Sequence, residues 1–137
     1  MNERGSEQLW DAQCLRRAIE AAEVALWSWN VATDLFNMDD RAFAIWGIPS
    51  NAAVTFEDLS SKIHPADRDR VRAAFAATRA HIGSYEIDFR ILIGNAVRWV
   101  SARGQGNDIG RVNDTVLGVF LDVTGRKQAE EGHELLA

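Results

Sequence analysis

The sequence has few cysteines and prolines and no long apolar run. Its 137 residues include one cysteine, Cys14, and two prolines. A single cysteine cannot form an internal disulfide, which is typical of a protein from a reducing compartment. No apolar run approaches the ~20 residues that a membrane span needs, and the first residues, MNERGSEQ, are polar. We therefore expect a soluble, cytoplasmic chain that does not enter a membrane.

Basic residues are fewer than acidic ones. The chain has 15 Lys and Arg against 20 Asp and Glu, a net charge of −5, and its basic residues cluster only in the short region 68–72. This composition argues against a nucleic-acid partner, because such binding depends on neutralising phosphates. Hydrophobic residues make up 47% of the chain, enough for one folded domain with a modest core.

Helical spacing of apolar residues predicts four helices before residue 83. They fall within residues 7–23, 39–49, 55–65 and 66–82. Asp39 or Asp40 is suited to cap the second helix, and Gly47 to end it. Thr55 and Asp58 have the spacing of a capping box at the start of the third.

Alternation of apolar and polar residues predicts five strands. Two short ones, ALWSWNV and LFNM, form a hairpin within 25–38, and three longer ones cover 85–92, 96–104 and 115–123. The pair Gly94-Asn95 predicts a tight turn between the first two of these. The last strand is apolar on both faces, so both should be covered. This order indicates an α+β fold, an antiparallel sheet with helices mainly on one face.

Five stretches, in chain order, resemble a PAS sensory domain. They carry a W-x-W start, an H-P-x-D helix start, an R-W-V strand and a D-V-T-x-R-K exit, and they are LWSWNVATDLFNMDDRAFAIWGIP, IHPADRDRVRAAF, YEIDFRI, VRWVSARG and GVFLDVTGRKQAE. The resemblance implies a PAS domain at 24–124, a flanking helix at 1–23 and the start of a signalling helix at 125–137. It also implies a sensory and dimerisation module that is not itself catalytic.

The resemblance further implies which side chains line a cavity between the sheet and its covering helices. These candidates are Trp27, Trp29, Phe43, Trp46, Leu59, Ile63, Val71, Phe75, Ile87, Phe89, Val100 and Phe120. Such rings would suit a small apolar or aromatic ligand. Large apolar residues also fill protein cores without any ligand. Both interpretations stay open at this point.

Two cofactors of related sensors are disfavoured. Light-sensing LOV members attach flavin to a cysteine, but alignment on Pro65 puts Leu59 at that position, and Cys14 lies outside the domain. This excludes flavin–cysteine photochemistry, although not loose flavin binding. Haem-binding members use a histidine on the longest helix, where this chain has arginines, and His81 comes only at its end. The resemblance therefore argues against haem.

Several polar residues have ordinary explanations. His64, His81 and His133 show no metal-ligand spacing with Cys14, so no metal is expected. We expect Arg90 to pair on the surface with Asp88 or a cross-strand acid. Arg103 could do the same or reach a ligand carboxylate, and that choice stays open.

The far face of the sheet would be apolar. Its residues include Trp99, Leu117, Val119 and Leu121. Such a face is too apolar to leave in water, and the N-terminal helix, through Leu15 and Ile19, or a second subunit should cover it. We expect a homodimer formed through these surfaces.

The D-V-T sequence at 122–124 ends the last strand. In the PAS resemblance, Asp122 and Thr124 anchor the exit helix to the sheet, with Thr124 as its cap. The following EEGHELLA resembles the run into the dimerising helix of histidine kinases. The resemblance therefore implies that the chain is the input domain of a bacterial two-component sensor, with its effector, a histidine kinase, C-terminal in the same protein.

A second hypothesis is a small α+β cone enzyme, similar to ketosteroid isomerase, acting on an apolar small molecule. Such an enzyme needs a polar base or oxyanion donor deep in its pocket. The inward positions expected here are almost wholly apolar, which counts against this alternative.

Overall fold

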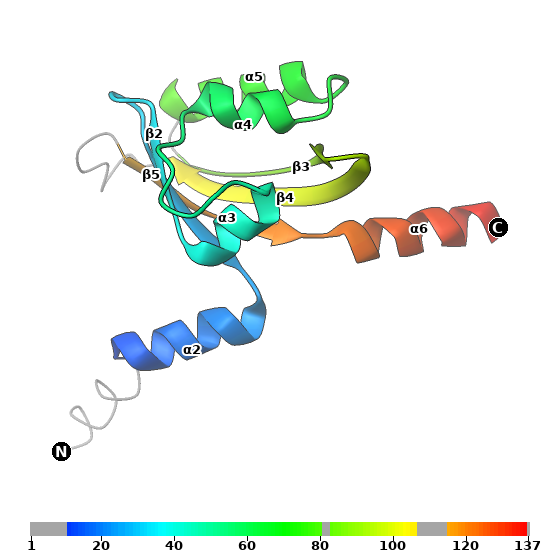
Figure 1. Ribbon diagram of the computed structural model, residues 1–137, viewed down its shortest axis with the longest axis horizontal. Helices are drawn as coiled ribbons and strands as arrows, with labels where there is room; N and C mark the ends of the chain where they lie inside the picture. Colours follow the sequence, from blue (N-terminus) through cyan, green and yellow to red (C-terminus); the bar gives the residue numbers. More distant parts are fainter. Residues whose placement is uncertain (1–10, 81–82, 107–114, 137) are drawn as a thin grey trace.

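A five-stranded antiparallel sheet forms the centre of the computed structural model, which describes residues 11–80, 83–106 and 115–136 (Figure 1). The strand order is β2-β1-β5-β4-β3. The elements follow the chain as α2 (Ala12–Ala22), β1 (Ala25–Asn30), β2 (Leu35–Met38), α3 (Asp40–Trp46), α4 (Phe56–Lys62), α5 (Arg68–Ala80), β3 (Gly83–Ile93), β4 (Ala96–Gly106), β5 (Thr115–Asp122) and α6 (Thr124–Leu136). The α+β fold expected from the sequence is confirmed, with its flanking N- and C-terminal helices. The first residues of the helix expected at 7–23, those before residue 11, lie outside the described residues, as does the connection at 107–114.

Two helices on the concave side, α3 and α4, begin at the caps that the sequence indicated, and α3 also ends at the expected glycine. Asp39 caps α3 by accepting a hydrogen bond from the backbone N–H of Ala42 at 2.8 Å, and Gly47 ends it with φ 66°. Thr55 and Asp58 form the expected capping box of α4, at 3.2 and 2.9 Å. These local signals are why two helices of only seven residues each are well defined.

The turn between β1 and β2 connects the sheet to α4. Asp34 has left-handed backbone geometry (φ 56°), which an aspartate tolerates better than most residues. Its Oδ1 accepts hydrogen bonds from the indole Nε1–H of Trp29 at 2.9 Å and from the backbone N–H of Phe56 at 3.2 Å. One carboxylate therefore holds β1, the turn and α4 together.

A buried carboxylate joins α5 to β3. Asp67, just before α5, accepts hydrogen bonds from the backbone N–H, Nε and Nη2 of Arg90 at 2.8, 3.0 and 2.9 Å. The expected pairing of Arg90 with Asp88 or a cross-strand acid is wrong, because the strand edge brings Arg90 to the start of α5 instead. The side-chain hydrogen bond from Arg90 lowers the pKa of Asp67 to about 2.

The longer strands alternate as expected. In β3, Phe89 and Ile91 are fully buried toward the helices, and Val100 and Ala102 of β4 face the same side. Gly94, with φ 60°, forms the two-residue turn between Ile93 and Ala96. The core therefore lies on one side of the sheet, under α3, α4 and α5 (Figure 1).

Of the two covers expected for the far face of the sheet, a helix at 7–23 or a second subunit, the described part of the helix does not bury it. No residue of α2 is buried, and Leu117 on β5 stays 62% exposed. The helix at 7–23, so far as it is described, therefore does not bury this face. Elsewhere on this face, the side chains of Arg90 and Lys127 cover the ring of Trp99. The Arg90 Cζ lies 5.5 Å and the Lys127 Nζ 5.1 Å from the centroid of that ring.

None of the helices that the structure describes combines the length and the apolar character needed to cross a membrane.

The Asp67–Arg90 contact predicts a specific loss of stability in acid. The pKa of Asp67 is about 2 in the folded protein and 3.8 as its ordinary value, so the contact stabilises the fold above pH ~4. This stabilisation is lost as the pH falls from about 4 to about 2. We expect Asp67→Asn to lower the free energy of unfolding at pH 7 by about 2 kcal/mol, and to remove most of that pH dependence.

Urea unfolding at pH 7, 4 and 2.5 measures both effects. Asp69→Asn is the matched control, because it makes the same charge change at an exposed position in the first turn of α5. Equal stability of the two variants at pH 7 would contradict the role given to Asp67.

Candidate functional site

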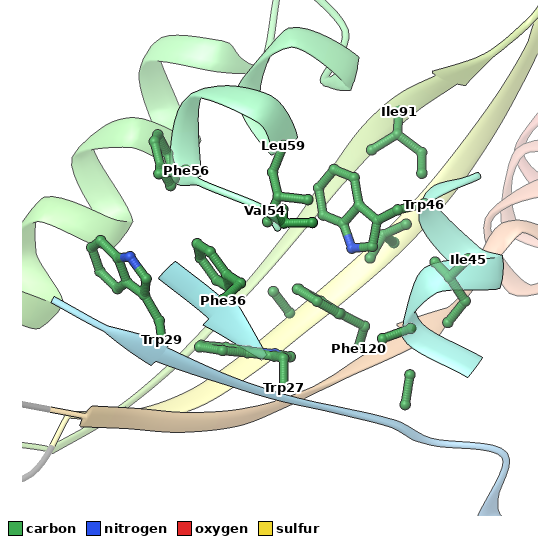
Figure 2. Packing of buried hydrophobic residues seen from close by; sticks show 14 of the residues in the cluster. Trp27, Trp29, Phe36, Ile45, Trp46, Val54, Phe56, Leu59, Ile91 and Phe120 are labelled. Atoms are coloured by element: carbon green, nitrogen blue, oxygen red, sulfur yellow. The ribbon is translucent and has the colours of Figure 1, made fainter. Parts of the chain in front are cut away.

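The two tryptophans of β1 lie on the concave face of the sheet. Trp27 and Trp29 are 3% and 2% exposed, because side chains two residues apart share one face of a strand. Trp27 stacks on Phe120 of β5 at 5.3 Å between ring centroids, and Trp29 stacks on Phe36 of β2 at 5.5 Å. Figure 2 shows these rings side by side above the sheet.

A glycine makes room for Trp27. Gly118 lies opposite Trp27 in the pairing of β1 with β5. A Cβ added to Gly118 would lie 2.3 Å from the Trp27 ring and 2.3 Å from the backbone oxygen of Arg103. Any side chain at this position therefore forces the indole or the sheet to move.

The other cavity candidates surround these rings. Phe43 and Trp46 come from α3, Leu59 and Ile63 from α4 and its end, Val71 and Phe75 from α5, and Phe89, Val100 and Phe120 from the sheet; each is 6% exposed or less. Ile87 is partly buried and packs against the cluster. The structure thus brings the candidates together in one apolar cluster. Their role in binding a ligand stays a prediction.

Two rings of this cluster were missed from the sequence. Phe36 and Phe56 contact several of its other aromatic rings. Phe36 lies in a strand of only four residues, and Phe56 directly follows a helix cap. Alternation in LFNM and the apolar residue after Thr55 were the signals available. Because these rings contact one another, they occupy much of the space that an aromatic ligand would need.

Two polar atoms inside the cluster have no partner. The indole Nε1–H groups of Trp27 and Trp46 are buried and make no hydrogen bond. The indole of Trp29 differs, because it donates to Asp34. A buried donor without an acceptor costs about 1–3 kcal/mol, so such groups are rare in native proteins.

The start of α6 is bonded to the backbone of Trp99 on β4. The Thr124 hydroxyl accepts from the N–H of Trp99 at 3.0 Å, and the N–H of Val123 donates to the Trp99 oxygen at 2.9 Å. Asp122 accepts from the N–H of Thr124 at 3.0 Å. Thr124 was expected to cap α6. Instead it is the first residue of that helix, and its hydroxyl is used for the link to β4.

Arg98 connects α3 to the same place. Its guanidinium donates to the backbone oxygens of Ala44, at 3.2 Å, and of Ile45, in the last turn of α3. Its Nε also lies 3.6 Å from the carboxylate of Asp122. The sequence showed Arg98 only as part of the R-W-V stretch, and nothing in the local pattern indicated these contacts.

A second contact holds α6 to the far face. Asp88 of β3 forms ion pairs with Arg126 at 2.8 Å and Lys127 at 3.1 Å. Burial raises the pKa of Asp88, but the neighbouring Ser101 side chain, the contact with Lys127 and the nearby positive charges outweigh it. The pKa of Asp88 is therefore below its ordinary value.

Arg103, left open by the sequence, pairs with Glu86 on the neighbouring strand at 3.2 Å. Both side chains are about half exposed on the far face, so this arginine does not point into the apolar cluster.

A groove of about 910 Å³ separates α2 from the body of the domain. Leu15 and Ile19 of α2 line one wall, and Leu26 of β1 and Ala44 of α3 lie on the other side. Leu15 and Leu26 are 48% and 38% exposed. The dimer-forming role expected of Leu15 and Ile19 stays a prediction.

Comparison with known proteins agrees with this fold. A family model described as the PAS fold matches residues 35–117, more than half of the chain. The chain belongs to the PAS family. Its PAS core comprises the apolar cluster described above, and the D-V-T sequence joins β5 to α6.

The curated relatives of this PAS domain include one that is named as a sensor protein. It is 33% identical over 122 residues to the non-motile and phage-resistance protein of Caulobacter vibrioides, covering 84% of this chain and 14% of that protein. It is 29% identical over 117 residues to the sensor protein FixL of Bradyrhizobium diazoefficiens, covering 84% and 23%. The chain therefore spans less than a quarter of the length of either relative.

A solved structure shows the same fold. The sensory box histidine kinase/response regulator from Burkholderia thailandensis superposes with a TM-score of 0.69 and 28% identity, covering 88% of this chain and 92% of that one.

The contact between Trp27 and Gly118 predicts a sharp size limit at that glycine. We expect Gly118→Ala to lower the free energy of unfolding by about 1–3 kcal/mol, because the added Cβ meets both the indole and backbone. Gly125→Ala is the control, because a Cβ added there meets no atom within 4 Å outside the adjacent residues and the backbone of its own helix. Thermal or urea unfolding of the two variants tests this, and equal stability would contradict it.

Proposed function

We propose that this PAS domain is the dimeric, non-catalytic input module of a sensor protein, and that it passes changes in its apolar core to α6. The contacts of Arg98 with both the last turn of α3 and Asp122 carry this proposal. They connect a helix whose buried face forms part of the core to the residues from which α6 begins.

We call the proposed series of contacts from the apolar core to α6 the path, and its first element is α3. Its residues Phe43, Ile45 and Trp46 are buried, and Trp46 lies against Phe89 and Phe120 of the sheet. A change in how these rings pack moves α3 relative to the sheet, because a packed interior has little free space to absorb it. The backbone oxygens that Arg98 holds belong to this helix.

The second step is from Arg98 to α6. A shift of the α3 carbonyls changes the position of the guanidinium, and through it the ion pair with Asp122. Asp122 in turn holds the N–H of Thr124. The hydrogen bonds of Thr124 and Val123 with Trp99 then act as a pivot for the first turn of α6.

The effector that we propose is a histidine kinase C-terminal to α6, in a cytoplasmic two-component sensor. The names of FixL as a sensor protein and of the Burkholderia protein as a histidine kinase support this choice. For the input we propose a small apolar or aromatic molecule held without a covalent bond. Leu59 stands at the position where LOV sensors carry their reactive cysteine, which supports this view.

Amide hydrogen exchange tests the path. Trp46→Phe changes the core side of α3, and we expect it to speed exchange in the first turns of α6. Arg98→Ala breaks the connection, so in that background Trp46→Phe should have no further effect on α6. Arg41→Ala is the control, because it removes an exposed arginine of α3 and should leave the effect of Trp46→Phe intact. An effect of equal size with and without Arg98 would rule out the path.

Loss of the pivot has its own signature. Thr124→Val removes the acceptor for the Trp99 N–H, and one lost hydrogen bond contributes about 1 kcal/mol. We expect about fivefold faster exchange of the Trp99 amide and of the first turn of α6, with the β1–β2 hairpin unchanged. Uniformly faster exchange across the domain would instead indicate a general loss of stability.

The proposed dimer is tested by light scattering at tens of micromolar protein. We expect two subunits for the wild type, and a monomer for a variant with Leu15→Ser and Ile19→Ser, whose apolar side chains line the groove beside α2. Arg17→Ser, an exposed change on the same helix, should remain a dimer. A monomeric wild type would contradict this part of the proposal.

A further inference from the structure

Two hydrogen-bond donors in the PAS core lack an acceptor. The indole N–H groups of Trp27 and Trp46 are unpaired although these residues are only 3% and 1% exposed. About nine in ten or more of such buried groups have a partner in native proteins. The same fold supplies one for Trp29, through Asp34 at 2.9 Å. The unpaired donors therefore distinguish one part of the core from the rest.

Both tryptophans contact the same ring. The centroid of Phe120 is 5.3 Å from that of Trp27 and 5.4 Å from that of Trp46, and Figure 2 shows Phe120 between them. Trp27 is stacked on Phe120 at 24°, so its N–H does not point at that ring. Trp46 meets Phe120 at 70°, where an N–H facing the ring is at best a weak substitute for an acceptor.

The described side chains offer no acceptor near the indole N–H groups of Trp27 and Trp46. Their buried polar residues are Ser60, Asp67 and Ser101. Ser60 lies near the guanidinium of Arg72, at 3.4 Å, and Asp67 is bound by Arg90. Ser101 lies opposite Asp88 on the far face of the sheet. An acceptor for Trp27 and Trp46 must therefore come from outside the side chains of this cluster.

We infer that the PAS core binds a neutral, flat, largely apolar molecule with a hydrogen-bond acceptor, an aromatic carbonyl compound, whose oxygen accepts from Trp27 or Trp46. This rests on the proposed function in one respect only, that a ligand is the input.

The chemistry of the cluster selects this class. The ligand is neutral, because the cluster is wholly hydrophobic and burying an unpaired charge there is strongly unfavourable. It is flat, because its surroundings are rings that stack at 5.3 and 5.5 Å. Since Phe120 separates the two indoles, a guest that reaches both of them displaces this ring.

Indole N–H resonances in proton–nitrogen NMR spectra report the binding directly. The chain has five tryptophans, so single Trp→Phe variants assign each signal. Acetophenone is the probe, and α-methylstyrene, which has the same shape with CH₂ in place of the carbonyl oxygen, is the matched control. We expect acetophenone to shift the Trp27 or Trp46 N–H signal downfield and saturably, with the Trp29 and Trp99 N–H signals nearly unchanged.

Removal of a donor should weaken only the ligand with an acceptor. We expect Trp27→Phe or Trp46→Phe to reduce the affinity for acetophenone about tenfold, as expected for loss of one buried hydrogen bond, with little change for α-methylstyrene. Trp99→Phe, outside the core, should change neither affinity. Equal binding of the two probes to the wild type would overturn the inference.

A second variant keeps the test decisive if displacement of Phe120 is too slow or too unfavourable in the wild type. Phe120→Ala opens space between the two indoles, as a large-to-small change does in other cores. We expect this variant to bind acetophenone about tenfold more tightly than α-methylstyrene. If neither probe binds the wild type measurably, equal binding of the two probes to Phe120→Ala would overturn the inference. The path from Arg98 to α6 is measured without any ligand, so the two proposals fail independently.

Discussion

The placement of the Trp27 indole against Gly118 is the contact on which the core depends. It sets β1 beside β5 with both tryptophans of β1 on the concave face. Phe120 stacks on one side of this indole, and Phe36 and Phe75 approach from the others. A shift of one residue in the pairing would turn Trp27 and Trp29 to the far face, since the side-chain period of a strand is two. Close packing at one glycine therefore specifies the register of the central strand pair.

Polar contacts do a different task in this fold. They lie at the edges of the apolar cluster and connect elements that are far apart in the chain. Asp34 connects the β1–β2 turn to α4, Asp67 connects α5 to β3, and Arg98 connects α3 to Asp122. The interior is thus held by area and shape, which are non-directional, while directional bonds set where the helices begin and end. In the proposed sensor, this division would carry a small change of packing to α6 through few, specific bonds.

Much of this arrangement was predictable from patterns within a few residues. The caps at Asp39 and Thr55, the turn at Gly94 and the alternation through Phe89 and Ile91 all follow from the chemistry of neighbouring residues. The order of helices and strands then indicated an α+β sheet with one covered face. The inward position of Trp27 and Trp29 rested on the family resemblance, together with the two-residue period of a strand.

The long-range polar pairs could not be found in this way. Arg90 has a carboxylate two positions away, yet its partner is Asp67, because the edge strand runs past the start of α5. Arg98 reaches the end of α3 more than 50 residues earlier in the chain. Thr124 has the residue type of a helix cap, but the backbone of Trp99 lies close enough to use its hydroxyl instead. Each of these partners is decided by which group of another element lies near, and that is a property of the assembled fold.

The tryptophans show most clearly what the sequence alone predicts and what only the tertiary structure decides. Their size and their spacing in W-S-W were enough to indicate burial, because burial follows from apolar area and from the period of a strand. Whether each indole N–H finds an acceptor does not follow from either. Trp29 meets Asp34 at the turn, whereas Trp27, two residues before it on the same face, and Trp46 lie among hydrocarbon. Hydrogen bonding requires one atom at one distance and direction, and only the packing of separate elements supplies or withholds that atom.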